Sequence, residues 1–286
     1  MLAQMRQARI LEEVHRSGGV RVSNLTDILG VSDMTIRRDL ELMARKGLLA
    51  KVHGGATAVD TASAVEPGFA AKSGRETAEK QAIAARAASL VRPGMAVAIT
   101  AGTTTWTLAT HLAAIASLTV VTNSLKVAEV LYAQGRPDLT VVLTGGIRTP
   151  SDGLVGPIAV HAIKSLHVDM VIMGVHGIDE RAGLTTPNLL EAETNRAFVD
   201  SARRLVVIAD NTKWGVVGLS QIAPLDAVTT LVTDDRLDAH AVRVLQERVG
   251  EVICVPRVDA GRPFSASELD SHHHGGANGE PAYRVH

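Results

Sequence analysis

Short aliphatic runs alternate with amphipathic stretches from residue 76 onward, and no other feature restricts the fold of this chain as much. Strands that alternate with helices form a mostly parallel sheet covered on both faces, the α/β class. The expected strands are Met95–Thr100, Thr119–Thr122, Thr140–Thr144, Met170–Gly174, Leu205–Ala209, Val228–Thr233 and Val252–Val255. The expected helices are Glu76–Leu90, Thr104–Ile115, Leu125–Ala133, Leu189–Ala202 and Asp238–Arg248. Aromatic residues make up only 2% of the chain, so an aliphatic core is expected.

The N-terminal stretch has a different pattern, that of three closely spaced helices. The apolar residues of Gln4–His15 fit one helical face. Ser23 can cap a second helix, which Gly30 ends in the place that favours a left-handed residue. Ser32 can cap a third helix, Asp33–Arg45. Two helices joined by such a short turn containing glycine are typical of a DNA-reading helix-turn-helix.

One face of the third helix is suited to contact DNA. Arg38 points away from the apolar face, and a guanidinium there can bind guanine or phosphate. The alternation over residues 47–55 ends in a glycine turn and predicts a hairpin wing on the phosphate backbone. The alternative is that Arg37 and Arg38 are ordinary solvated charges. The predicted DNA contacts are Ser32, Met34, Thr35, Arg37, Arg38, Lys51 and His53.

The distribution of charge favours DNA contact at one end of the chain. Residues 1–55 carry nine Lys or Arg and six Asp or Glu, a net charge of +3, which leaves −4 for the rest of a chain whose formal charge is −1. A weakly basic N-terminal domain on an acidic body fits a protein that meets double-stranded DNA through its N-terminal domain.

Polar loops follow the predicted strands, where the ligands of open α/β sheets bind. The loop Gly102–Thr105 enters a helix, and its N–H groups and hydroxyls suit a phosphate. Taken alone, such a turn is more often a simple helix cap. Together the loops offer anion donors, a lysine charge and acceptors for sugar hydroxyls. The candidate effector-binding residues are Thr100, Gly102, Thr103, Thr104, Thr105, Asn123, Gly145, Gly146, Asp179 and Lys213.

Two groups of motifs resemble those of the DeoR/GlpR family of bacterial transcriptional regulators. The N-terminal group is residues 31–40, Val-Ser-Asp-Met-Thr-Ile-Arg-Arg-Asp-Leu, followed by Val-His-Gly-Gly-Ala at 52–56. The second group comprises Ala101–Thr105, Val121–Ser124, Leu143–Gly146, Leu154–Pro157, Gly177–Asp179, Glu191-Ala192, Asp210–Lys213 and Val232–Asp234. The resemblance implies a winged helix-turn-helix and a sensor domain similar to ribose-5-phosphate isomerase. It implies a repressor that a phosphorylated sugar or related metabolite releases, although activation stays open.

The chain departs from the family pattern at two positions. Thr100 stands where the family usually has an acidic residue, and Asn195 stands where it commonly has a lysine. Losing a carboxylate that accepts sugar hydroxyls and a cation that pairs with an anion would change ligand selectivity.

The rival hypothesis is a phosphosugar isomerase or deaminase with a DNA-binding appendage. Catalysis needs a positioned acid or base, and the acidic and basic residues of the loops show no recognisable catalytic spacing. We therefore predict no enzyme, no catalytic residue, no metal site and no cofactor. The adjacent histidines 272–274 are assigned no site. The single cysteine, Cys254, is expected in the core and indicates a reducing compartment.

The remaining expectations concern domain limits, assembly and location. The N-terminus lacks a signal peptide core, and no run of about 20 apolar residues could cross a membrane, so a cytoplasmic protein without membrane contact is expected. Helix-turn-helix proteins generally bind DNA as symmetric pairs, so a homo-oligomer, at least a dimer, is expected. The predicted parts are a DNA-binding domain, 1–57; a linker, 58–75; an effector-sensing domain, 76–258; and a disordered tail, 259–286.

Overall fold

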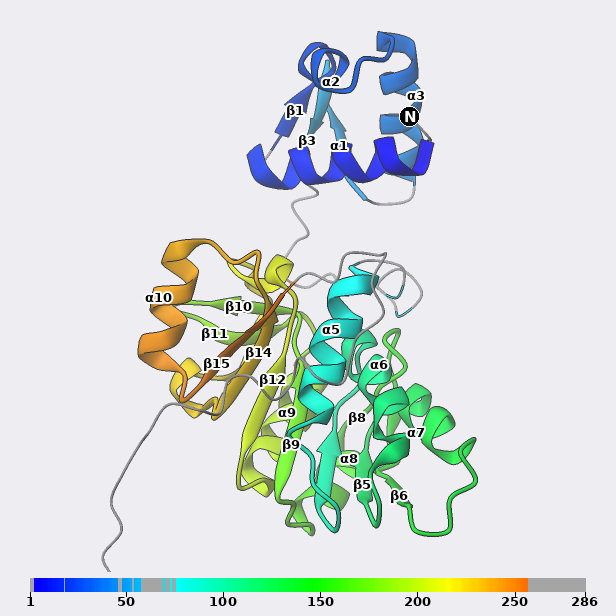
Figure 1. Cartoon of the computed structure of the whole chain (residues 1–286), viewed down its shortest axis with the longest axis vertical. Coiled ribbons are helices and arrows are strands. Elements are labelled where there is room, and N and C mark those ends of the chain that lie inside the picture. Colours follow the sequence, from blue (N-terminus) through cyan, green and yellow to red (C-terminus); the bar gives the residue numbers. More distant parts are fainter. Residues whose placement is uncertain are drawn as a thin grey trace, which may run out of the picture. The chain divides into compact units, whose positions relative to one another are not determined.

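The protein divides into two compact units, Met1–Val65 and Glu66–His286. The computed structural model describes residues 3–17, 19–45, 48–52, 54–57, 69, 73 and 76–256. The division falls within the stretch predicted as a linker, most of which lies outside the described residues, as does the predicted tail. Figure 1 shows both units, each of which is considered by itself below.

The first unit is a winged helix-turn-helix, as predicted. Its helices pack around a core that includes Ile10, Leu25, Ile36, Leu40 and Met43, all of them buried. The strands form a three-stranded antiparallel sheet in the order β1-β3-β2. The elements are α1 (Ala3–Ser17), β1 (Gly19–Arg21), α2 (Val22–Leu29), α3 (Asp33–Arg45), β2 (Ala50–Val52) and β3 (Gly55–Thr57).

Local signals around the turn are largely confirmed. Gly30 ends α2 with φ 63°, and the Thr35 N–H donates to Ser32 Oγ (3.4 Å) at the start of α3. The prediction that Ser23 caps α2 is wrong. Strand β1, which the sequence did not predict, runs straight into the helix, so Arg21 takes the cap position and the Val22 N–H donates to the Gly54 carbonyl (2.9 Å).

The second unit is built on a parallel seven-stranded sheet in the order β15-β14-β12-β9-β4-β5-β6. Every neighbouring pair in it is parallel. All the predicted strands are present, within two residues at each end. They are β4 (Ala96–Ile99), β5 (Thr119–Thr122), β6 (Thr140–Leu143), β9 (Met170–Gly174), β12 (Leu205–Ile208), β14 (Thr230–Asp234) and β15 (Val252–Val255).

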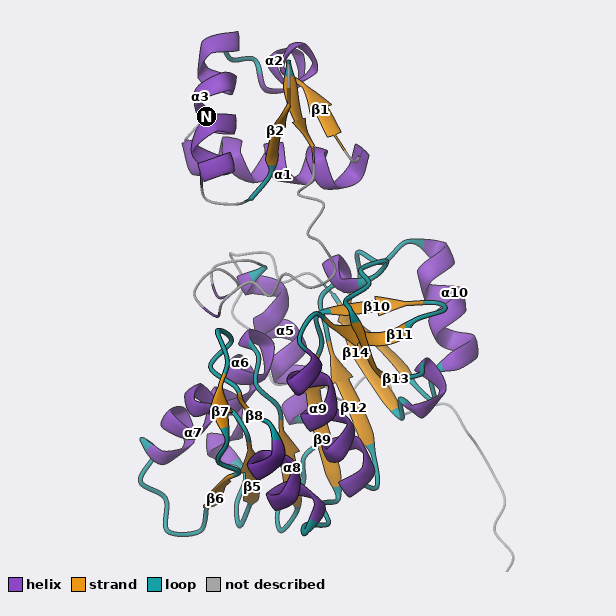
Figure 2. Ribbon diagram, turned by 180° about the vertical axis from the view of Figure 1, so that it is seen from behind, coloured by secondary structure: helices purple, strands orange, loops and turns teal. Residues whose placement is uncertain are grey.

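Helices cover both faces of this sheet and create two cores. Alternate residues of β4 face opposite sides: Val97 and Ile99 pack with α5, α6 and α7, whereas Ala98 packs with α8, α9 and α10. Figures 1 and 2 show these two faces in turn. The helices are α5 (Thr77–Ala88), α6 (Thr103–His111), α7 (Leu125–Tyr132), α8 (Pro157–Lys164), α9 (Leu189–Ser201) and α10 (Ala239–Arg248).

Several short elements were not predicted and frame the loops at the sheet edge. Among them are α8 and a second, three-stranded antiparallel sheet in the order β10-β11-β13. These elements are β7 (Ile147–Arg148), β8 (Leu154–Val155), β10 (Gly177–Asp179), β11 (Gly183–Thr186), β13 (Ser220–Ala223), η2 (Asn211–Lys213) and η3 (Leu225–Ala227). The short helix η1 (Leu112–Ala114) falls within the predicted helix Thr104–Ile115. Among the described residues, no helix is both long and apolar enough to span a bilayer.

Candidate DNA-binding and effector sites

The exposed face of α3 presents the predicted DNA contacts. Met34 is 78% exposed, and Arg38 is also exposed. Arg37 forms an ion pair with Asp33 one turn earlier (Nε to Oδ1, 2.5 Å), which lowers the pKa of the Asp33 carboxyl. Arg38 forms no ion pair within the described part of the chain. The two adjacent arginines therefore differ, since one is held within the helix and the other is available to DNA.

A hollow of about 290 Å³ separates this helix from the wing. Arg37 and Leu40 of α3 line one side, and the exposed Lys51 of β2 lines the other. The position of Lys51 on the wing agrees with the expected geometry, whereas His53 lies outside the described residues. Cations on two sides of a hollow suit the phosphate backbone of a duplex.

Sequence reasoning missed the side chain that fixes the orientation of α3. Asp39 is only 6% exposed, and its carboxylate accepts from Arg6 Nε (2.5 Å) and Gln7 Nε2 (3.0 Å) of α1. An acidic residue directly after two arginines was the available signal, because a carboxylate turned toward DNA would repel phosphates. Asp39 faces inward and ties α3 to α1.

The second candidate site lies where the strand order reverses. From β4 the chain continues to β5 and β6 on one side, and then to β9 and β12 on the other. Ligands of open α/β sheets bind outside the carboxyl ends of the strands at such a point. The loop Gly102–Thr105 leaves β4 at this point and begins α6, where the first N–H groups of a helix have no helical acceptor. These N–H groups suit an anion. The Thr105 side chain is buried and its hydroxyl donates to the Gly102 carbonyl (3.0 Å), so it supports the loop.

Two of the predicted ligands serve as supports for this loop. Thr100 is 1% exposed, and its hydroxyl accepts from the Gly174 N–H (3.3 Å), joining β4 to β9. Asn123 is 3% exposed; its Oδ1 accepts from the Ala101 N–H (2.9 Å), and its Nδ2 donates to the Leu154 carbonyl (3.0 Å). These bonds hold the loops after β4, β5 and β9 together. Direct contact of either residue with an effector stays a prediction.

A carboxylate that was not among the predicted ligands faces the same loops. Glu191, in the first turn of α9, accepts from the Thr149 hydroxyl (3.3 Å) and the Thr186 hydroxyl (3.0 Å). Thr149 lies near the first loop, because a Cβ at Gly153 would meet Thr149 Oγ1 at 3.4 Å and Ala101 Cβ at 2.9 Å. The sequence signal that could have identified Glu191 was the motif Glu191-Ala192. The Glu191 carboxylate thus accepts hydroxyl groups at this site.

The remaining predicted ligands are spread around this site. Gly146 has φ 122°, and a Cβ there would lie 2.5 Å from the Val155 carbonyl oxygen, so glycine is required by the close approach of β8. Gly145 precedes it, after the edge strand β6. The Asp179 carboxylate accepts from the N–H groups of Arg181 and Ala182 (both 2.8 Å) within the turn after β10. Lys213 ends η2 beyond β12, and its side chain forms no ion pair with any residue in 76–256.

Comparison with known families identifies both units. Residues 75–235 match the DeoR C-terminal sensor domain, and residues 6–62 match the DeoR-like helix-turn-helix domain. The chain belongs to the DeoR family of transcriptional regulators. DeoR-family membership confirms a DNA-binding regulator with a sensor domain for a small molecule, and it favours this function over the enzyme hypothesis.

Similar proteins extend over nearly the whole chain. GlpR of Haloferax volcanii is 37% identical and covers 84% of this chain and 93% of its own. The glycerol-3-phosphate regulon repressor of Escherichia coli is 32% identical, covering 80% and 91%. The repressor CsqR of the same species is 31% identical, covering 89% and 96%. Ribose 5-phosphate isomerase A from Neisseria gonorrhoeae aligns at 17% identity over 49% of this chain and 54% of its own, with a TM-score of 0.36.

Proposed function

We propose that this DeoR-family regulator represses a carbohydrate-metabolism operon and that a phosphorylated sugar or related metabolite releases it from its operator. The observation that carries the proposal is the Gly102–Thr105 loop at the reversal of strand order, with the Glu191 carboxylate supported on the same group of loops. The Gly102–Thr105 loop suits a phosphate and the Glu191 carboxylate accepts hydroxyls, and the two together match a phosphosugar. One relative bears the name of a glycerol-3-phosphate regulon repressor, which supports this ligand class.

Selectivity within that class depends on the two departures from the family pattern. At Thr100 a carboxylate is replaced by a hydroxyl that is bonded to the backbone of β9. Asn195, which replaces a lysine, is 9% exposed on α9. The site therefore has one fewer hydroxyl acceptor and one fewer cation than the family pattern. We propose that its carboxylate is supplied by Glu191 and its free cation by Lys213.

Release follows from linkage between the two sites. If effector binding favours an arrangement of the DNA-binding domains that no longer matches the operator half-sites, DNA must weaken effector binding by the same factor. The proposal includes at least a homodimer, because symmetric half-sites are read by paired helix-turn-helix units. Because the regulator acts on chromosomal DNA, we also propose that it works in the cytoplasm.

The test is a screen for release of DNA. A fluorescent duplex selected from a random library by the purified protein is titrated with ribose 5-phosphate, fructose 1-phosphate, glucose 6-phosphate, glycerol 3-phosphate and inorganic phosphate. A phosphorylated sugar that dissociates the complex at a concentration where inorganic phosphate does not would support the proposal. Failure of every phosphorylated sugar, together with release by an uncharged sugar, would contradict it.

A further inference from the structure

Phe69, a residue of the predicted linker, contacts the sensor domain beside the effector loops. The ring of Phe69 packs edge-on against Trp106, with centroids 5.8 Å apart and planes at 84°. The Phe69 N–H donates to the Pro150 carbonyl (3.1 Å). Trp106 directly follows Thr105, and Pro150 directly follows Thr149, which bonds to the proposed effector carboxylate. Both partners of Phe69 are thus chain neighbours of residues at the proposed site.

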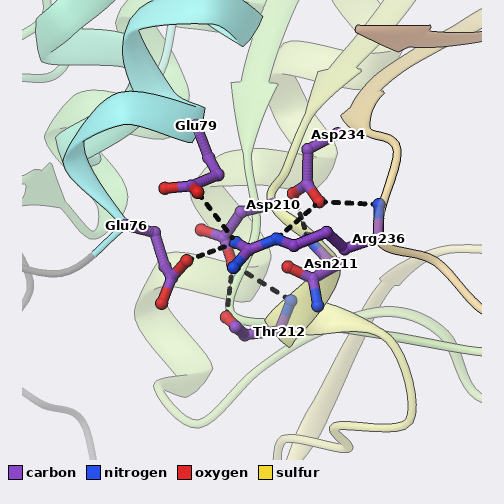
Figure 3. A network of polar contacts seen from close by, with 7 residues as sticks. All are labelled: Glu76, Glu79, Asp210, Asn211, Thr212, Asp234 and Arg236. Carbon is purple, nitrogen blue, oxygen red and sulfur yellow. Dashed lines mark hydrogen bonds and ion pairs between the residues drawn. The ribbon is translucent and has the colours of Figure 1, made fainter. Parts of the chain in front are cut away.

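A second contact, an ion pair of Glu76, lies where the same segment enters α5. Glu76 has a left-handed backbone, φ 47° and ψ 44°, which is unfavourable for a residue other than glycine. Its carboxylate pairs with Arg236, which also pairs with Glu79 (3.4 Å) and Asp234 (3.2 Å). Figure 3 shows the guanidinium enclosed by these three carboxylates. Burial lowers the pKa of Arg236, but Glu76 and Asp234 outweigh burial and raise it.

This arginine cluster is continuous with another loop of the effector site. Asp234 is 2% exposed and accepts from the Asn211 N–H (2.8 Å), which lies in the loop that ends at Lys213. Figure 3 shows Asp210, Asn211 and Asp234 side by side. Asn211 Oδ1 is buried and accepts no hydrogen bond from the described residues. A buried acceptor without a donor destabilises the fold, so a rearrangement that brings a donor to Asn211 Oδ1 would lower the free energy of this loop.

We propose that Phe69 and Glu76 form the coupling element through which the effector site acts on the DNA-binding domain. The inference rests on the proposed function and adds the route by which the effector site is coupled to the DNA-binding domain. Phe69 senses the loops after β4 and β7, and Glu76 senses the loop after β12 through Arg236. A ligand that moves either set of loops must alter a contact of the segment that continues to the helix-turn-helix. A passive tether would leave these contacts unchanged when DNA binds.

The test uses reciprocity and needs no identified effector. The full-length protein is labelled with 5-fluorotryptophan, and the fluorine resonances of Trp106 and Trp214 are followed as the selected duplex is added. We expect DNA to shift the Trp106 resonance. Phe69→Leu and Arg236→Met should each reduce this shift severalfold, while the Kd for the duplex changes by no more than about threefold. Tyr132→Leu is the matched control, because Tyr132 is an exposed aromatic residue (83%) on α7.

The possible outcomes separate this inference from the proposed function. A Trp106 resonance that DNA leaves unmoved, or a shift that persists in both variants, would overturn the coupling role. A far-UV circular dichroism spectrum that matches the wild type in each variant shows that the domain is folded. If a phosphorylated sugar releases DNA from Phe69→Leu and Arg236→Met as readily as from the wild type, the coupling element is wrong and the sensor function stands. If no sugar releases DNA from the wild type, the fluorine shift still decides the coupling role.

Discussion

Replacing Arg38 by Ala tests whether α3 reads bases through the guanidinium that the fold leaves available. Arg38 is exposed and has no ion-pair partner among the described residues, so its loss should not destabilise the first unit. A bidentate contact with a guanine contributes about 1–3 kcal/mol of discrimination, or about 5- to 150-fold in Kd. Two protomers on a symmetric site lose this contact twice, so we expect specific binding to weaken about 30-fold or more.

The assay compares two duplexes over a range of salt concentrations. Fluorescence anisotropy gives the Kd for the selected duplex and for a scrambled duplex between about 50 and about 200 mM salt. Arg38→Ala should weaken the selected duplex far more than the scrambled one. Lys51→Ala, on the wing, should weaken both alike and lower the salt slope by about two, one for each protomer. If Arg38→Ala behaves as Lys51→Ala does, Arg38 contacts phosphate and the assignment of base reading to it is wrong.

Three further predictions follow from side-chain contacts in the structure. Asp33→Asn should tighten DNA binding about two- to fivefold in the anisotropy assay, because it frees a guanidinium and removes a negative charge; weaker binding would contradict this. Glu191→Gln should raise the Kd of a DNA-releasing sugar about tenfold by calorimetry, whereas the exposed Glu193→Gln should not; equal effects would contradict a role for this carboxylate. The Arg136 hydrogen bond lowers the pKa of Asp138 to about 2 from 3.8, so the stability that Asp138→Asn removes should be present at pH 7 and vanish as the pH falls from 3.8 through about 2; a difference in urea midpoint that is independent of pH would contradict it.

The main sheet could be predicted from the sequence because its strands are mostly short aliphatic runs. The central strands β9 and β12 are buried. The edge strands β6 and β15 are partly exposed, and Cys254 on β15 is exposed, so its expected place in the core is wrong. Runs such as Leu205–Ala209 have no other plausible place in a chain of this composition. The second sheet could not be predicted, since β10 and β11 are short and rich in glycine and polar residues. Strand β11 pairs with β13, more than thirty residues later, which no local pattern contains, and β10 in turn pairs with β11. Strand β1 was missed for the same reason, because it pairs with β3.

At the effector site, the sequence predicts which residues lie together but not which way their side chains point. Position at the end of a strand brings Thr100, Asn123 and Gly102 to the same edge of the sheet, and this much follows from topology. Whether a side chain turns toward the ligand or toward its neighbours depends on which backbone groups the fold leaves unpaired nearby. Asn123 is turned inward by the Ala101 N–H and the Leu154 carbonyl, groups that meet only because β8 returns to the end of β5. The same return brings Thr149 to Glu191, so one unpredicted strand both holds Asn123 inward and supports the carboxylate that we propose as an effector ligand.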